Sequence, residues 1–248
     1  MPLQVERRDA VAVLTLDDPE RRNALGNEMV DQIVATMSDF RDDESVGAVV
    51  VTGAGSAFCS GADVGNLVKL TDADGGDAHE VRNIYEGFLV FRDSPLPTIA
   101  AVNGPAVGAG FNLALACDVR LVTPDARFDT RFTTIGSHPG GGHVWMLDRL
   151  GGPQTAAAMV AFGERVSGER AVELGLAWRC VEPDALVDTA VEMAARAATV
   201  PRALMAKVKT TLQEAPWQPD FEAAVTAELD RQAWSFAQGY LNERVRRP

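Results

Sequence analysis

The residues from Ser94 to Cys117 include no charged side chain, and this run constrains the fold more than any other stretch of the chain. The run is long enough for a membrane-spanning helix, but Pro95, Pro97 and Pro105 interrupt it. It therefore predicts a buried strand, a turn and a buried helix. The N-terminus has no apolar segment typical of a signal peptide. We expect a soluble, cytoplasmic protein.

Strand–turn–helix units recur along the chain. Runs rich in β-branched residues predict strands at Ala10–Leu16 and Val46–Gly53, and the helical spacing of apolar residues predicts an amphipathic helix over Asn27–Phe40 between them. The same order returns in "TIAAV", "FNLALAC" and "VRLVT". Later, "LAWRCV" predicts a strand, followed by a helix from Asp184 to about Ala198. Such alternation indicates an α/β architecture.

The region after Pro201 has no strand pattern. Helices are predicted over Ala203–Leu212 and Phe221–Phe236. Residues 199–248 have too little apolar content to fold alone, so we expect them to pack on the core formed by residues 1–198 and on neighbouring subunits. The acidic, glycine-rich stretch 71–77 predicts a mobile surface loop.

Charge and cysteine content exclude several classes of protein. The chain has 248 residues and a net charge of −12, which argues against nucleic acid or an anionic membrane as partner. Cys59, Cys117 and Cys180 are odd in number and lack metal-type spacing, so they are predicted to be buried thiols in a reducing compartment. We expect no metal site.

The chain lacks the complete sequence motifs of a dinucleotide-binding unit and of a serine hydrolase. The segment "VVVTGAGSAF" resembles the start of a dinucleotide-binding unit, but Phe58 stands where the third glycine is required. Neither Tyr85 nor Tyr240 is followed by Lys four residues later, as a reductase of that type would need. The chain also contains no G-x-S-x-G elbow of a serine hydrolase.

Two small-residue turns remain, "SAFCSGAD" and "NGPAVGAG", each after a predicted strand. The second opens a helix, whose free N–H groups and partial positive charge suit an anion. Together the turns can place two N–H donors on one developing oxyanion, the arrangement used in acyl and enolate chemistry. The alternative is that both are tight connections of a close-packed sheet.

The order of the motifs "RRNALGNEM", "VTGAGSAFCSGAD", "AAVNGPAVGAGFNLALACDVRL" and "ERVSGERAVELGLAWRCVEPDAL" resembles the crotonase superfamily, the enoyl-CoA hydratase/isomerase family, over roughly Val11 to Ala198. The resemblance implies a spiral core of ββα units and C-terminal helices that form a homotrimer, with trimers often paired into hexamers. It also implies an acyl-CoA substrate, with coenzyme A as part of the substrate and no covalently bound cofactor.

The resemblance assigns roles to individual residues. The backbone N–H groups of Ala62 and Ala109 would form the oxyanion hole for the thioester carbonyl, although the family usually has Gly in place of Ala109. Arg21 and Arg22 are candidate phosphate partners, or else solvated surface residues. Residues expected to bind the substrate are Arg22, Ala24, Gly61, Asp63, Gly108, Phe132, Gly140 and His143.

The two glutamates with which a hydratase of this family adds water are absent. Their places are held by Asn112 and Phe132. Losing an acid or base costs roughly 10²–10⁴ in rate, so other groups must act or catalysis is weak. Asn112 is predicted to orient water or substrate, or alternatively to satisfy buried backbone groups.

Candidates that could replace the missing glutamates lie in and near the segment "IGSHPGGGHVWML". His138 is the first candidate for acid–base catalysis and His143 the second, because histidine titrates near neutrality. The alternatives are a rigid turn at His138 and a helix cap at His143, before a helix that begins near Val144. Further candidates are Asp129, Arg131, Tyr85 and Glu86, although strand alternation turns the first two outward.

These observations predict an acyl-CoA enzyme, nominally an enoyl-CoA hydratase that acts through an oxyanion-stabilised enolate. One alternative is another CoA-thioester reaction that uses His138: isomerisation, decarboxylation or hydrolysis. Another is an acyl-CoA binding protein without catalytic activity.

Overall fold

The computed structural model describes residues 1–63 and 78–245. Within them lies a sheet of six strands in the order β1-β2-β3-β4-β6-β9, in which β1 and β2 are antiparallel and the other neighbours are parallel. The strands are β1 (Leu3–Arg8), β2 (Val11–Leu16), β3 (Ala48–Gly53), β4 (Thr98–Val102), β6 (Val119–Val122) and β9 (Arg179–Cys180). The expectation for 71–77 lies outside the described residues.

A second sheet of the described residues contains three short strands in the order β5-β7-β8. They are β5 (Pro105–Val107), β7 (Arg127–Asp129) and β8 (Val166–Ser167). The turn predicted at Pro105–Val107 is wrong, because this segment is an extended strand paired in parallel with β7. Two sheets and alternating helices confirm the α/β class.

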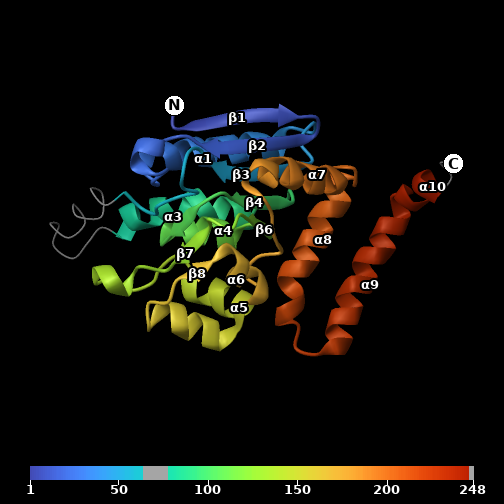
Figure 1. Cartoon of the computed structure of the whole chain (residues 1–248). Coiled ribbons are helices and arrows are strands. Elements are labelled where there is room, and N and C mark those ends of the chain that lie inside the picture. The colour runs from blue at the N-terminus through green and yellow to red at the C-terminus, as the bar shows by residue number, and fades with distance from the viewer. Residues whose placement is uncertain (64–77, 246–248) are drawn as a thin grey trace.

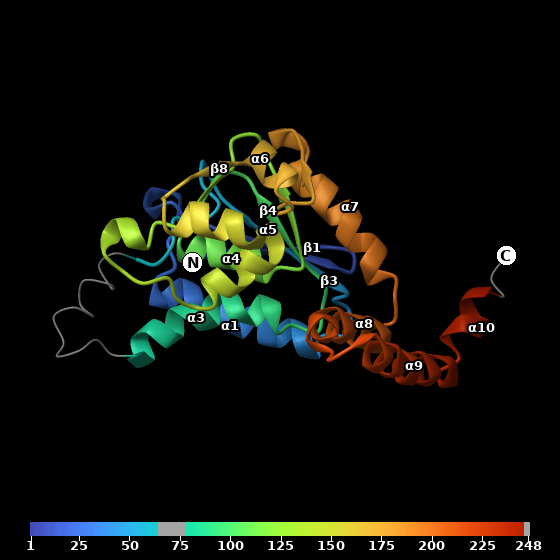
Figure 2. The same ribbon diagram turned by 90° about the horizontal axis from the view of Figure 1, so that it is seen from below.

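Helices cover both faces of the larger sheet (Figures 1 and 2). Alternate residues of β2 face opposite ways: Val11 and Val13 pack with α7 (Leu186–Ala198), whereas Leu14 and Leu16 belong to the larger core. This larger core also includes residues of α1 (Asn27–Asp42), α3 (Ala78–Arg92) and α4 (Ala109–Ala116). Burial on both faces explains why the inner strands are almost continuously apolar.

Five more helices and four 3₁₀ turns complete the described part of the chain. The helices are α5 (His143–Val160), α6 (Gly168–Glu173), α8 (Arg202–Glu214), α9 (Phe221–Ala237) and α10 (Tyr240–Val245), and the 3₁₀ turns are η1 (Pro19–Arg21), η2 (Thr133–Ile135), η3 (Pro183–Ala185) and η4 (Ala215–Trp217). Helix α5 is kinked at Gly152, before Pro153. Both views show α9 and α10 extending beyond the body of the molecule (Figures 1 and 2).

Helix α8 is joined to the core by two basic side chains. The guanidinium of Arg202 donates to the carbonyls of Phe40, Arg41, Asp43 and Val46, at and beyond the end of α1. Further along, Lys209 is only 4% exposed. These contacts place α8 against residues of the 1–198 region.

The cysteine prediction is correct at two of three positions. Cys59 and Cys117 are buried, and burial raises the pKa of each thiol to about 12. Cys180 is only half-buried, because it lies in the short edge strand β9. The "LAWRCV" segment forms a shorter strand than expected.

Candidate active site

Two loops that follow the neighbouring parallel strands β3 and β4 meet beyond the ends of those strands. The N–H groups of Phe58 and Cys59 both donate to the carbonyl of Pro105 at 3.1 Å, and the N–H of Val107 donates to that of Cys59 at 3.0 Å. The two turns singled out in the sequence are therefore hydrogen-bonded to each other.

Glycine allows this close approach. A Cβ atom on Gly110 would lie 2.2 Å from the carbonyl oxygen of Cys59. A Cβ on Gly61 would lie 2.7 Å from the oxygen of Val107 and 3.6 Å from the backbone nitrogen of Ala109, and Gly61 has a φ of +101°. Any larger residue at either position would push the loops apart. The backbone beside Ala62 is thus in contact with the backbone around Ala109.

The N–H groups of Ala62 and Ala109 have no hydrogen-bond acceptor among the described residues. Ala109 is the first residue of α4, so its N–H points out of the helix N-terminus. The neighbours of Ala62 are paired instead, since Leu25 donates to Gly61 and Asp63 donates to Leu25. The positive φ of this turn falls on Gly108 and not on Ala109, so alanine is accommodated there.

The segment that contains Arg22 and Ala24 is anchored by the buried side chain of Asn23. Its Oδ1 accepts from the N–H of Asp18, and its Nδ2 donates to the carbonyls of Ala54 and Ala57 at 2.9 and 2.8 Å. Sequence reasoning missed this role of Asn23. The available sequence signal was an amide that follows two arginines and precedes an apolar residue. In the structure, Arg22 and Asn23 both have positive φ.

The candidate phosphate partners lie on the surface near this segment. Arg21 is 3.6 Å from Asp63 and 4.0 Å from Asp18. Arg22 is exposed, and its carbonyl accepts from the N–H of Ser60. The backbone N–H and carbonyl of Ala24 are both bonded within the loop. The positions suit a ligand that lies along the loop, and the assigned roles stay predictions.

Asn112 and His143 form a buried pair. Asn112 is 1% exposed and lies in the first turn of α4, three residues after Ala109. Its Oδ1 is 2.6 Å from Nδ1 of His143, and its Nδ2 donates to the carbonyl of Gly140 at 3.0 Å. His143 is 1% exposed and is the first residue of α5, but its side chain makes no capping bond. Burial lowers the pKa of His143 to about 4.

Aromatic side chains surround this pair. The rings of Phe111 and Phe132 lie edge-on to the imidazole of His143, with centroids 5.4 and 5.0 Å away. The hydroxyl of Tyr85 lies so close to Gly140 that a Cβ there would be 2.1 Å from it. Glu86, the other candidate on α3, is exposed. Tyr85 therefore lies beside the pair, and Glu86 does not.

The other two predicted catalytic side chains have different surroundings. His138 is exposed, and its Nδ1 is 2.7 Å from the carbonyl of the next residue, Pro139. The carboxylate of Asp129 is 3.0 Å from Arg165 and 3.7 Å from Arg131. Gly108 contacts Asp129 through the backbone, by an N–H donated to its carbonyl at 2.9 Å. The structure gives their proposed chemistry no support beyond this proximity.

A model of the enoyl-CoA hydratase/isomerase family matches residues 6–242. The chain belongs to this family. It is 49% identical over 205 residues to the probable enoyl-CoA hydratase EchA14 of Mycobacterium tuberculosis, which covers 82% of this chain and 78% of the relative. The enoyl-CoA hydratase/isomerase family is an enzyme family, so the chain is identified as one of its enzymes.

Solved structures of enoyl-CoA hydratases share the fold. The enoyl-CoA hydratase of Polaromonas sp. JS666 superimposes with a TM-score of 0.91 at 29% identity, over 98% of this chain and 95% of that one. A structure from Thermobifida fusca YX in complex with CoA gives a TM-score of 0.84 at 29% identity, over 96% and 93% of the two chains. The predicted crotonase fold, with two sheets and C-terminal helices, is confirmed.

The described residues contain neither of two other kinds of site. Among residues 1–63 and 78–245, no helix combines the length and apolarity needed to cross a membrane. The same residues contain no group of three or more histidine, cysteine, aspartate or glutamate side chains placed to hold a metal ion.

Proposed function

We propose that this enoyl-CoA hydratase/isomerase family enzyme hydrates 2-enoyl-CoA thioesters. The observation that supports the proposal is the pair of backbone N–H groups of Ala62 and Ala109, which have no acceptor among residues 1–63 and 78–245 and lie on two loops joined by hydrogen bonds. A thioester oxygen bound by both gains negative charge when a nucleophile attacks C3 of the enoyl group. Fixed donors stabilise that charge without reorganisation.

The CoA part of the substrate would lie along the Arg22–Ala24 segment, with the arginines near its phosphates. Leu25 pairs with Ala62, so this segment is connected directly to one of the two donors. The acyl group would then extend past Gly108 toward Phe132, Gly140 and His143. The exposed position of His138 does not favour the alternative reactions that depend on it.

A direct assay tests this proposal. Purified protein is mixed with 2-enoyl-CoA thioesters of several chain lengths, and loss of the conjugated thioester absorbance is followed. We expect loss of absorbance together with formation of the 3-hydroxyacyl-CoA. Calorimetric binding of acyl-CoA without any product at high enzyme concentration would reject hydration and identify the chain as an acyl-CoA binding protein.

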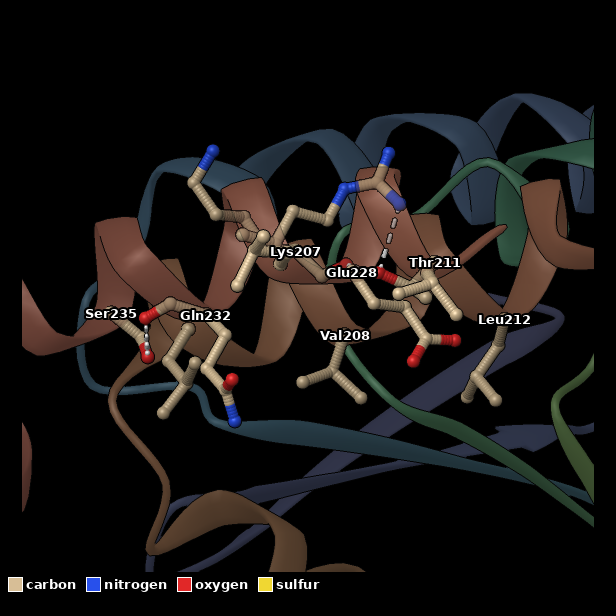
Figure 3. Close-up of a pocket in the computed structure, with 11 residues that line it drawn as sticks. Lys207, Val208, Thr211, Leu212, Glu228, Gln232 and Ser235 are labelled. Carbon is tan, nitrogen blue, oxygen red and sulfur yellow. Dashed lines mark hydrogen bonds between the residues drawn. The ribbon is translucent and has the colours of Figure 1, made fainter. Parts of the chain in front are cut away.

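We also propose that the chain forms a homotrimer, alone or paired as a hexamer, through its C-terminal helices. A groove of about 480 Å³ lies between α8 and α9, and Figure 3 shows Val208 and Leu212 beside it. Leu212 is 70% exposed and Leu229 60%. Large exposed apolar side chains indicate an interaction surface.

Light scattering measures the assembly directly. We expect a native mass three or six times that of the chain. Leu229→Asp, which places a charge on α9, should shift the mass toward that of a single chain. A wild-type protein with the mass of one chain at micromolar concentration would contradict the proposal.

A further inference from the structure

One buried nitrogen in the described part of the chain is unpaired. Nε2 of His143 is the buried side-chain nitrogen or oxygen that lacks a hydrogen-bond partner there. The residue is 1% exposed, so the ring is shielded from bulk solvent. A buried polar group without a partner is unfavourable, and a catalytic role is one established reason for a protein to keep one.

The hydrogen bonds of Asn112 fix which nitrogen of His143 carries the proton. The carbonyl of Gly140 can only accept, so the side-chain atom of Asn112 that faces it is the amide nitrogen. The amide oxygen therefore faces Nδ1 of His143, 2.6 Å away, and Nδ1 must donate. In the neutral ring, Nε2 is then the unprotonated nitrogen with a free lone pair.

The position of the ring connects it to the proposed reaction. His143 contacts Asn112 and Phe132, the two residues that stand where the family resemblance expects glutamates. Asn112 is one helical turn from Ala109, whose N–H is one of the two proposed oxyanion donors. The imidazole that carries the unprotonated Nε2 thus contacts the residues at both of the expected glutamate positions.

This inference rests on the proposed function. We propose that Nε2 of His143 accepts the hydrogen bond, and then the proton, of the oxygen that adds to C3 of the acyl group. In hydration that oxygen belongs to the attacking water, and in the reverse direction it is the 3-hydroxyl of the substrate. His143 is then the group that both accepts and returns the proton.

One base is sufficient for hydration, because the proton that it takes from water is the proton that it later gives to C2. Water forms a bond to C3 while its proton passes to Nε2, and the C2=C3 electron pair moves to give the enolate held by Ala62 and Ala109. The imidazolium then returns the proton to C2, which gives the 3-hydroxyacyl thioester and neutral His143. Because burial lowers the pKa of His143 to about 4, the ring is neutral near pH 7 and its Nε2 is free to accept a proton.

A binding comparison tests the hydrogen bond without requiring turnover. Calorimetry compares a 3-hydroxyacyl-CoA with the saturated acyl-CoA of the same length. We expect wild-type protein to prefer the hydroxylated thioester by about tenfold, and His143→Phe to lose that preference while still binding the saturated one. An equal preference in both proteins would overturn the inference alone. If neither thioester bound wild-type protein, the proposed function would fail together with it.

Turnover gives a second readout. His143→Phe should lower kcat for the 2-enoyl-CoA by about 10²–10⁴-fold, with a much smaller change in KM. The same substitution at exposed His138 tests the rival assignment. A large loss of kcat at His138 with none at His143 would overturn the inference.

A measurement on wild-type protein covers the case in which His143→Phe does not fold. The chain has three histidines, so ring nitrogen resonances of ¹⁵N-histidine-labelled protein can be assigned. We expect an unprotonated Nε2 for His143, whose resonance shifts on adding the 3-hydroxyacyl-CoA and not on adding the saturated acyl-CoA. A protonated Nε2 at neutral pH, or identical shifts with both ligands, would overturn the inference.

Discussion

Replacing Ala109 with proline is expected to lower kcat for 2-enoyl-CoA hydration by roughly 10²–10³-fold, the cost of losing one oxyanion donor. Proline removes the N–H and nothing else that the helix uses. Ala109 is the first residue of α4, where proline is compatible with helical φ and the missing N–H has no acceptor within the helix. Steady-state kinetics and a thermal unfolding curve of the same preparation measure the effect and check the fold.

Ala109→Gly is the matched control, because it keeps the N–H and restores the residue that is usual in the family. We expect its kcat to stay within a few-fold of wild type. If Ala109→Pro folds and turns over the thioester at the wild-type rate, the Ala109 N–H does not hold the oxyanion. Equal losses in the proline and glycine variants would point to packing rather than to the donor.

Replacing Lys209 with methionine is expected to lower the free energy of unfolding by about 2 kcal/mol, because its buried ammonium donates to two carbonyl oxygens and lies beside a partly exposed carboxylate. Its Nζ lies 2.9 Å from Oδ2 of Asp118 and donates to the carbonyls of Leu96 and Phe91 at 2.9 and 3.2 Å. Methionine fills similar volume but leaves the two carbonyl oxygens without this donor, whereas Oδ2 of Asp118 keeps its hydrogen bonds from the N–H and hydroxyl of Thr98. Urea unfolding at one fixed protein concentration measures the change.

Lys207→Met on the same helix is the control. The ammonium of Lys207 lies over the ring of Trp234, 4.5 Å from its centroid, a contact worth about 1 kcal/mol or less at a partly exposed site. We expect the Lys209 variant to lose clearly more stability. Equal losses would show that helix propensity or surface charge, and not the buried contacts of Lys209, determines the effect.

The spacing of apolar residues predicted those helices and strands that bury one or both of their faces. The helix expected over Asn27–Phe40 is α1, and the strand "TIAAV" is β4, because their apolar residues follow the spacing that burial requires. Strand β1 was not predicted. It is an edge strand with mostly exposed side chains, including Glu6 and Arg7, so no apolar pattern marks it.

The sequence predicted the two backbone loops of the candidate site, but it did not predict how the side chains of the site pair. Glycine and alanine after two strands indicated loops that approach closely, and the structure joins them through Val107 and Cys59. The pairing of Asn112 with His143 spans residues far apart in the chain. His138 and His143 flank the same glycines, so the sequence could not separate their roles, and His138 was the first candidate. The structure separates them, because His143 is buried and His138 is exposed.

By itself, the order of motifs and apolar periods determined the family, the α/β class and the two loops that carry the proposed donors, because these are local properties of strands, turns and glycines. Only the tertiary structure decided which imidazole is buried, which of its nitrogens is protonated and how α8 is attached to the core. Those outcomes depend on hydrogen bonds and burial between segments distant in sequence, and no local pattern specifies them.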